Sequence, residues 1–180
     1  MLQKITCSGI GGQGVLTLGT ILAETAAALG LFATWLPEYE GAMRGGASAS
    51  KVKISDEKII SPFMEEIDIL VALNEASLQL YGEQVVENGY IIIEEELVPD
   101  VPKYQNKKVV KIPAIKLVAD IGNPKGMSVA VAGAIVACAD LFPYDTALEA
   151  VGAYFESKHL PVDENKAAFA AGYRFVKEAS

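Results

Sequence analysis

The hydrophobic positions of the chain fall into two alternating patterns. Short apolar runs rich in Val and Ile predict strands over Gln3–Ser8, Phe32–Trp35, Ser48–Ile54, Ile67–Leu73, Tyr90–Glu94 and Val109–Ile112. Longer segments with apolar residues three or four positions apart predict helices over Gly14–Leu29, Glu75–Val86, Met127–Leu141, Tyr144–Tyr154 and Val162–Lys177. This alternation predicts an α/β fold: one Rossmann-like three-layer domain over residues 1–180, with a mostly parallel sheet and right-handed crossovers.

Composition narrows the classes of protein and partner. With 180 residues, of which 51% are hydrophobic and 21% charged, the chain can bury a substantial core. Its net charge of −8 and the lack of a basic run argue against nucleic acid as a partner. Apolar segments are broken by glycines near the N-terminus and by Asp140 further on, so we expect no membrane span. Two cysteines are too few for an iron–sulfur cluster or structural zinc and suit a reducing cytoplasm.

A glycine loop follows the first predicted strand and leads directly into the first predicted helix. Its sequence, Gly9-Ile10-Gly11-Gly12-Gln13-Gly14, fits the G-x-G-x-x-G pattern, which brings backbone N–H groups close to a phosphate or carboxylate. A dinucleotide site also needs an acid at the end of the second strand. Here Glu38 and Glu40 come only after Pro37. We therefore favour another anion or another subunit at the loop, although the glycines could also serve only to pack the helix.

A second glycine-rich segment, Arg44-Gly45-Gly46, follows the second predicted strand. A guanidinium group next to exposed backbone amides is suited to hold a carboxylate or phosphate. A surface turn with a solvated Arg explains the same residues equally well. The sequence physics alone leaves both interpretations open.

Together these segments resemble the gamma subunit of the 2-oxoacid:ferredoxin (acceptor) oxidoreductases, which act on pyruvate, 2-oxoglutarate or ketoisovalerate. The glycine loop combined with Trp35, Tyr39 and Arg44-Gly45-Gly46 is the most specific part of the resemblance. It continues through Thr34-Trp35-Leu36-Pro37, Val52-Lys53-Ile54-Ser55-Asp56, Ser61-Pro62, Asp68-Ile69-Leu70-Val71-Ala72-Leu73-Asn74 and the segment from Asn165 to Gly172-Tyr173. The sequence departs from the family pattern at Ala42, where the family usually has a glutamate. This difference bears on which partner subunit the chain contacts and on which 2-oxoacid the enzyme uses.

The resemblance implies one subunit of an enzyme that converts a 2-oxoacid and coenzyme A to acyl-CoA and carbon dioxide, passing two electrons to ferredoxin or a similar acceptor. The implied partners are alpha and beta subunits, with a delta subunit as a further candidate. Thiamine diphosphate and iron–sulfur clusters are expected in those partners, and no tightly bound cofactor in this chain. Coenzyme A, or else a docking partner subunit, is the candidate ligand of Ser8, Gly9, Gly11, Gly12, Gln13, Gly14, Arg44, Gly45 and Gly46.

The sequence predicts no catalytic residue and no metal site in this chain. His159, the only histidine, lies in a predicted surface loop, and Cys7 and Cys138 are predicted to be inert core thiols. The acidic run Glu94-Glu95-Glu96 is predicted to be a solvated strand end. The small residues of Met127–Leu141 are predicted to approach the sheet, with another subunit as the alternative. We expect the isolated chain to be inactive; a standalone nucleotide-dependent dehydrogenase and a non-catalytic assembly module stay open as alternatives.

Overall fold

The computed structural model of the protein describes residues 1–39, 47–102, 104 and 106–179. A mixed six-stranded sheet forms its centre, in the order β2-β3-β1-β4-β5-β6. Strands β1, β4, β5 and β6 are parallel to one another, whereas β3 is antiparallel to both of its neighbours, β1 and β2. The expected α/β fold with a mostly parallel sheet is confirmed. The strands span Leu2–Ile10 (β1), Phe32–Tyr39 (β2), Ala47–Ser55 (β3), Ile67–Ala72 (β4), Val85–Glu94 (β5) and Lys108–Ile112 (β6).

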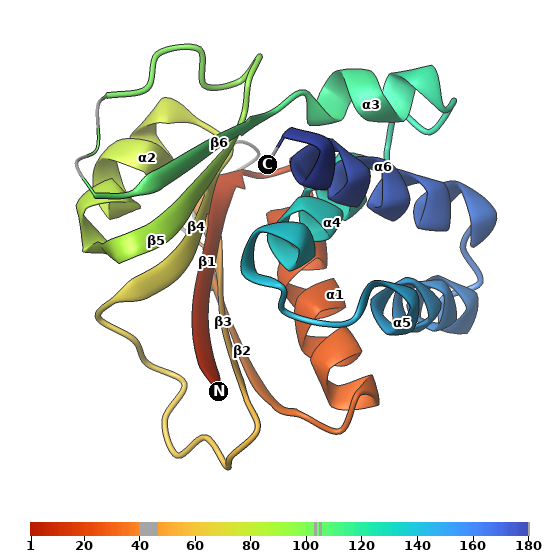
Figure 1. The fold of residues 1–180 in the computed structure, drawn as a ribbon, viewed down its shortest axis with the longest axis horizontal. Helices are drawn as coiled ribbons and strands as arrows, with labels where there is room; N and C mark the ends of the chain where they lie inside the picture. Colours follow the sequence, from red (N-terminus) through yellow and green to blue (C-terminus); the bar gives the residue numbers. More distant parts are fainter. Residues whose placement is uncertain (40–46, 103, 105, 180) are drawn as a thin grey trace.

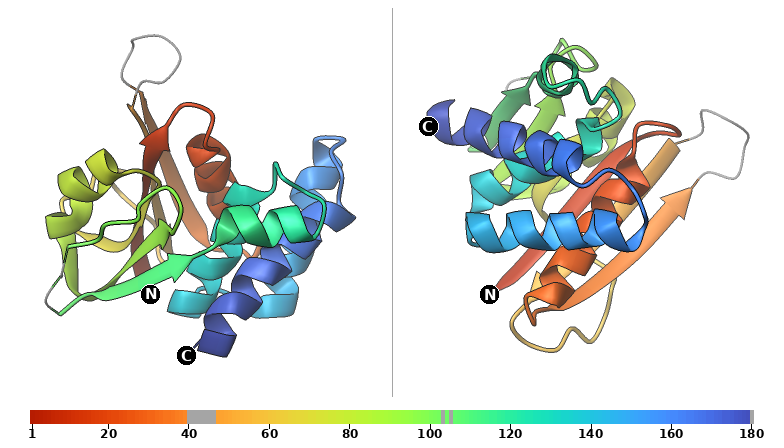
Figure 2. Two further views of the ribbon diagram at one scale, coloured as in Figure 1. Left: turned by 90° about the horizontal axis from the view of Figure 1, so that it is seen from above. Right: turned by 90° about the vertical axis from the view of Figure 1, so that its right-hand side faces the viewer.

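The helices cover the two faces of the sheet unequally. Helices α1, α3, α4, α5 and α6 lie on one side and α2 on the other (Figure 1). On the crowded side, α5 and α6 lie outermost, over α1 and α4 (Figure 2). Within the described ranges, no helix combines the length and apolar character needed to cross a bilayer. The helices span Val15–Ala28 (α1), Glu75–Tyr81 (α2), Ala114–Asp120 (α3), Met127–Ala139 (α4), Tyr144–Ser157 (α5) and Asp163–Ala179 (α6), with a 3₁₀ turn at Gly82–Gln84.

Helix α4 is buried along most of its length, which explains why it contains no charged residue. Every residue from 128 to 137 is buried, and its apolar side chains share one core with the sheet and α6. Small residues allow α4 and α6 to touch backbone to backbone. A Cβ at Gly133 would collide with the Phe169 carbonyl, and one at Gly172 with the Ala130 carbonyl. The small residues of this helix therefore make their close backbone approach to α6, whereas the prediction placed that approach at the sheet.

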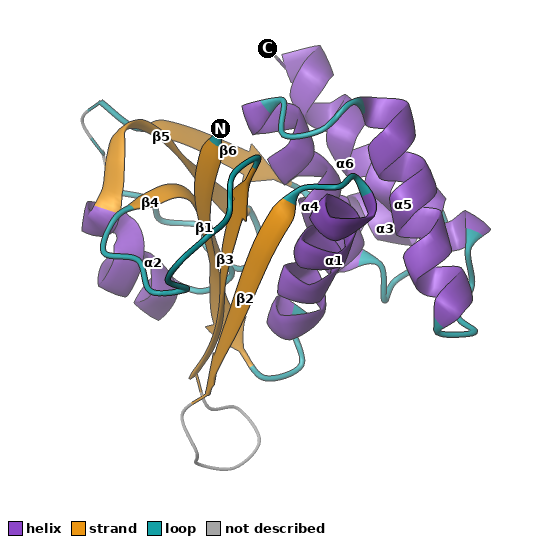
Figure 3. Ribbon diagram, turned by 90° about the horizontal axis from the view of Figure 1, so that it is seen from below, coloured by secondary structure: helices purple, strands orange, loops and turns teal. Residues whose placement is uncertain are grey.

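The antiparallel pair β2–β3 packs on α1 at a glycine of that helix. Trp35 Nε1 donates a hydrogen bond to Ser50 Oγ (3.1 Å), and Gly19 of α1 leaves the space that both side chains fill. On the opposite face, the connection between β3 and β4 lies over the strands (Figure 3), where the Lys53 ammonium donates to the Ser61 carbonyl. The tryptophan that contributes to the family resemblance is therefore a packing residue of this fold.

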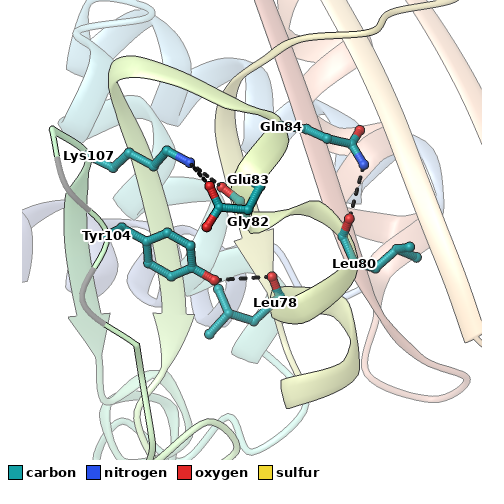
Figure 4. Close-up of polar contacts among 7 residues, drawn as sticks. All are labelled: Leu78, Leu80, Gly82, Glu83, Gln84, Tyr104 and Lys107. Carbon is teal, nitrogen blue, oxygen red and sulfur yellow. Dashed lines mark hydrogen bonds and ion pairs between the residues drawn. The ribbon is translucent and has the colours of Figure 1, made fainter.

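The helix predicted over Glu75–Val86 is too long. Helix α2 ends at Tyr81, and the chain passes through the 3₁₀ turn into β5. A side chain at Gly82 would collide with Tyr104, while the Lys107 ammonium binds the Gly82 carbonyl (2.8 Å) and Glu83 (3.3 Å) (Figure 4). Contacts from Tyr104 and Lys107, 26 and 25 residues beyond their partners Leu78 and Gly82, therefore end this helix.

Two other predicted boundaries are corrected by the structure. Strand β2 was expected to stop at Trp35 but runs through Pro37 to Tyr39. An edge strand tolerates proline because one of its sides makes no ladder hydrogen bonds. Helix α3, a seven-residue helix that directly follows Pro113, was not predicted.

Candidate functional site

The glycine loop is a tight turn closed by one side chain. Gln13 Oε1 accepts from the Ile10 N–H (2.8 Å), and Gln13 Nε2 donates to the carbonyl of Leu73 (3.0 Å), the residue after β4. Gly9 is buried beneath this amide, and a Cβ there would collide with Gln13 Oε1. Gln13 thus ties the turn after β1 to the neighbouring parallel strand, and Gly9 makes room for that link.

Two glycines of the loop have left-handed backbone conformations. Gly12 (φ 99°) projects into open space, while Gly14 (φ 75°) is the N-cap residue of α1. A Cβ at Gly14 would lie 2.9 Å from both Cβ and Oγ of Ser128, in the first turn of α4. Gly14 is therefore required both by its conformation and by the close approach of α4.

The loop has a cleft on each side. The glycine-loop cleft, of about 600 Å³, is lined by Gly12, Gln13, Gly14, Leu97, Ile115, Pro124, Lys125, Met127 and Ser128. The β1-end cleft, of about 410 Å³, lies towards α2 and is lined by Ser8, Ile10, Glu38, Tyr39, Ala47, Ser48, Ala49, Asn74, Ala76, Ser77, Leu80 and Tyr81. Both lie where the carboxyl end of β1 meets its neighbours, the place where open α/β sheets bind ligands.

The structure divides the predicted site residues between these clefts. Gly12, Gln13 and Gly14 line the glycine-loop cleft. Ser8 lies in the β1-end cleft, where its buried hydroxyl shares a hydrogen bond with Ser77 (2.8 Å). Gly9 is buried and Gly11 is exposed, and neither lines a cleft. Arg44, Gly45 and Gly46, like Ala42, lie outside the described residues.

The ends of β2 and β3 that flank this second segment are placed beside the glycine loop. Ala47, the first residue of β3, pairs with Ile10, and Ser48 pairs with Tyr39. Tyr39 is 66% exposed, and Leu80 across the cleft is 63% exposed. The rim of the β1-end cleft thus presents large apolar side chains to solvent.

A buried carboxylate holds the far wall of the glycine-loop cleft. Glu94, the last residue of β5, is fully buried, so the prediction of a solvated side chain is wrong for this residue. Its Oε2 accepts from the N–H groups of Glu96 (2.8 Å) and Leu97 (3.0 Å), and its Oε1 accepts from the Ile115 N–H (3.2 Å). Leu97 and Ile115 both line the cleft, so Glu94 fixes them relative to each other. The sequence feature that could have predicted the burial of Glu94 is its position at the end of an apolar strand.

The two thiols and the imidazole line neither cleft. Burial raises the pKa of the Cys7 thiol well above its usual range. Burial also raises the pKa of Cys138 to about 11, with the Lys177 ammonium opposing the shift. His159 is exposed just after α5. In the described ranges, no group of three or more His, Cys, Asp or Glu side chains is arranged to hold a metal ion.

Comparison with protein families matches residues 4–175 to the family Pyruvate ferredoxin/flavodoxin oxidoreductase. The 2-oxoglutarate synthase subunit KorC of Methanocaldococcus jannaschii is 31% identical over 182 residues, covering 99% of this chain and 96% of that protein. The ketoisovalerate oxidoreductase subunit VorA of Methanothermobacter marburgensis is 34% identical over 134 residues, covering 74% of this chain. The matched region is 28% of VorA, so the chain corresponds to only part of that relative.

Solved structures share the whole fold. The gamma subunit of the keto/oxoacid ferredoxin oxidoreductase from Geobacter sulfurreducens PCA superposes with a TM-score of 0.83 at 28% identity, covering 99% of this chain and 98% of that one. The 2-oxoglutarate:ferredoxin oxidoreductase of Magnetococcus marinus, solved with 2-oxoglutarate, coenzyme A and succinyl-CoA bound, gives a TM-score of 0.84 at 20% identity. That match covers 99% of this chain and 32% of the other, and at this identity it shows the fold alone.

Proposed function

The chain belongs to the gamma-subunit family of the 2-oxoacid:ferredoxin oxidoreductases, and from this premise we propose that it serves such an enzyme by holding coenzyme A and by docking its partner subunits. In the overall reaction, a 2-oxoacid and coenzyme A give acyl-CoA and carbon dioxide, and two electrons pass to two molecules of ferredoxin. Thiamine diphosphate, when bound in a partner, supplies the electron sink for decarboxylation. Residues 1–180 act as one domain that binds and positions, and the redox centres lie in partner subunits.

The glycine-loop cleft carries the first half of this proposal. At about 600 Å³ it lies within the range of small-molecule sites, and Gly12, Gln13 and Gly14 present backbone to it. Gln13 keeps the loop in shape without any bound molecule, through its contacts to Ile10 and Leu73. A preformed turn at the start of a helix suits the phosphate groups of coenzyme A.

The β1-end cleft supports the second half, contact with alpha and beta subunits. The exposed apolar side chains Ile10, Tyr39 and Leu80 are surfaces that an interface would remove from water. Arg44 lies between β2 and β3 in the sequence, so we assign it to the same contact or to a coenzyme A phosphate. Both cysteines are free, which suits the cytoplasm as the compartment of the complex.

The sheet order argues against a standalone dehydrogenase. In a dinucleotide-binding fold, the second strand lies beside the first and places an acid near the glycine loop. Here β3 separates β2 from β1, and Glu38 on β2 makes an ion pair with Lys51 (2.9 Å). Glu38 also lines the β1-end cleft rather than the glycine-loop cleft. A dehydrogenase would require NAD(P)H binding by the isolated chain.

Anaerobic tagged purification tests the assembly half of the proposal. We expect the chain to bring with it subunits that contain thiamine diphosphate and iron–sulfur clusters, detected by mass spectrometry and absorbance. Recovery of the chain alone would overturn the proposal.

Titration of the purified complex with coenzyme A tests the ligand half. Gln13→Ala should weaken binding because it releases the turn, whereas Gln79→Ala, an exposed glutamine on α2, should leave the affinity unchanged. Arg44→Ala distinguishes the two roles proposed for the second segment. Weaker coenzyme A binding would indicate a phosphate contact, and loss of assembly would indicate a subunit contact. Equal affinity for all three variants and the unaltered complex would favour the non-catalytic assembly module.

A further inference from the structure

The connection between β3 and β4, residues 56–66, is an irregular segment held firmly against the sheet. We call it the strap; it contains no helix or strand and lies across the strands (Figure 3). Side chains of β1 and β3 hold it in place through polar contacts: Lys53 Nζ to the carbonyls of Ser61 (3.0 Å) and Phe63, Thr6 Oγ1 to Met64 Sδ (3.8 Å), and Lys4 Nζ to Glu66 (2.9 Å). A loop positioned by a rigid scaffold in this way is a common carrier of function.

The strap presents large apolar side chains to water instead of burying them. Ile60 is 97% exposed and Phe63 is 72% exposed. Leu2 and Phe32, both exposed, pair with Ser55 from its two sides, so they lie on one face of the sheet beside the strap. Leu2 and Ile60 also line one cleft of about 410 Å³. These four apolar side chains form the strap patch, and grouped apolar surfaces of this kind mark protein–protein contacts.

The exposed rim of the strap patch is acidic. In the strap, every residue of which is described, Asp56, Glu57, Glu65 and Glu66 are exposed acids and Lys58 is the one exposed cation. Asp56 and Glu66 pair with cations at the start of the chain, whereas Glu57 and Glu65 form no ion pair within the described residues. Two copies that met patch to patch would bring these acids together, which costs free energy. The rim therefore favours a partner whose apolar surface is surrounded by basic residues.

The strap patch and the β1-end cleft lie at opposite ends of the same strand. Leu2 and Ile10 are the first and last residues of β1, about 26 Å apart at the usual rise of a strand. The strap lies near the N-terminus of the chain, whereas the glycine loop leaves the other end of β1 (Figure 1). A contact at the strap patch is therefore separate from the contact assigned to the β1-end cleft.

We propose that the strap patch is a second docking surface, on which a partner subunit of the oxidoreductase places an apolar surface rimmed by Lys and Arg. Ile60 and Phe63 are the anchors that enter the partner. Lys53 is a positioning residue, which holds the strap in its docking shape before the partner arrives and so lowers the cost of ordering it. The identity of the occupant as a partner subunit rests on the proposed function.

Anaerobic binding measurements between the full chain and its partner subunits test the two anchors. Ile60→Ser and Phe63→Ser together should weaken association about tenfold or more, because buried aliphatic and aromatic anchors carry much of the binding free energy. Leu160→Ser is the matched control, since Leu160 is also exposed but follows α5 on the other side of the sheet (Figure 1). The melting temperature of the full chain should stay unchanged in all of these variants, because the side chains are exposed.

Two further variants test the charge of the rim and the role of Lys53. Glu65→Lys should slow association, whereas Glu156→Lys, an exposed acid on α5, should not. Lys53→Met removes the donor to the strap carbonyls. It should speed hydrogen exchange in residues 56–66 of the free chain and weaken association, although Lys53 does not reach the partner. Faster exchange with unchanged association would contradict the positioning role.

The outcomes separate the strap patch from the proposed function. Association that is unchanged in the Ile60 and Phe63 variant, or reduced as much in Leu160→Ser, contradicts the docking surface and leaves the proposed function intact. Self-association of the unaltered chain that is lost in the same variant would assign the patch to a second copy and overturn the proposal. If the unaltered chain binds no subunit with thiamine diphosphate or iron–sulfur clusters, the proposed function fails, and the assignment of the occupant fails with it.

Discussion

Replacing Glu94 by glutamine should loosen the wall of the glycine-loop cleft. The carboxylate accepts three backbone hydrogen bonds, from Glu96, Leu97 and Ile115, and it is fully buried. A glutamine amide has one acceptor oxygen, so its NH₂ group must face at least one of these N–H donors. If the oxygen stays with Glu96 and Leu97, the bond to Ile115 is lost and its donor faces another donor.

The size of the effect follows from these contacts. A hydrogen bond to a charged group contributes about 1.5–3 kcal/mol, and the two that remain become weaker with a neutral acceptor. Removing a buried charge offsets part of this loss. We expect Glu94→Gln to lower the free energy of unfolding by about 2 kcal/mol, equivalent to a melting temperature about 4–8 °C lower at this chain length.

Urea and thermal unfolding followed by circular dichroism measure this change. Glu95→Gln is the control, because this neighbour is exposed and should change stability by less than about 0.5 kcal/mol. Hydrogen exchange at the Leu97 and Ile115 amides should become faster only in Glu94→Gln. Equal stability of the Glu94 and Glu95 variants would refute the reasoning, and unchanged exchange would show that the carboxylate does not hold the wall.

Three further outcomes are expected from the glycines and thiols. Gly14→Ala should destabilise the chain by about 1 kcal/mol more than Gly12→Ala, since both are strained at positive φ but only Gly14 faces a side chain 2.9 Å away; equal losses in urea unfolding would contradict this. Gly133→Ala should cost about 3 kcal/mol or prevent folding, because the new methyl meets the α6 backbone; a normal unfolding midpoint would disprove that contact. With the pKa of Cys138 raised to about 11, only about one thiolate in a thousand exists at pH 8. Ellman's reagent should therefore react slowly with Cys138 and with Cys7 until the protein is unfolded, and rapid reaction of the folded chain would count against their burial.

The parts of the fold that hydrophobic periodicity determines were predictable. All six strands and the helices α1, α4, α5 and α6 overlap the segments that the pattern predicts. The signal is strongest where apolar side chains are buried in a run, as in β1 and β4. The end of α2 and the existence of α3 were not predictable from local pattern. The first depends on Tyr104 and Lys107, and the second begins beside the carboxylate of Glu94.

The candidate site was predictable only in part. The loop from Gly9 to Gly14 identifies a backbone turn at the start of a helix, and the structure contains that turn. The position of β3 between β1 and β2 is a long-range pairing that no local signal gives. The same is true of Ser128, which meets Gly14 from more than 100 residues away and appears in the sequence as one more small residue of an apolar helix.

The burial of α4 between the sheet and α6 also sets an order of events during synthesis. Met127–Ala139 leaves the ribosome well before Asp163–Ala179, so this apolar helix is complete while its cover is still missing. Until α6 arrives, the exposed backbone around Gly133 and the apolar flank of α4 are open to wrong contacts. The domain therefore cannot finish folding strand by strand from its start. It closes only when α6 has been made, and a nascent chain stalled before that helix is a natural substrate for chaperones.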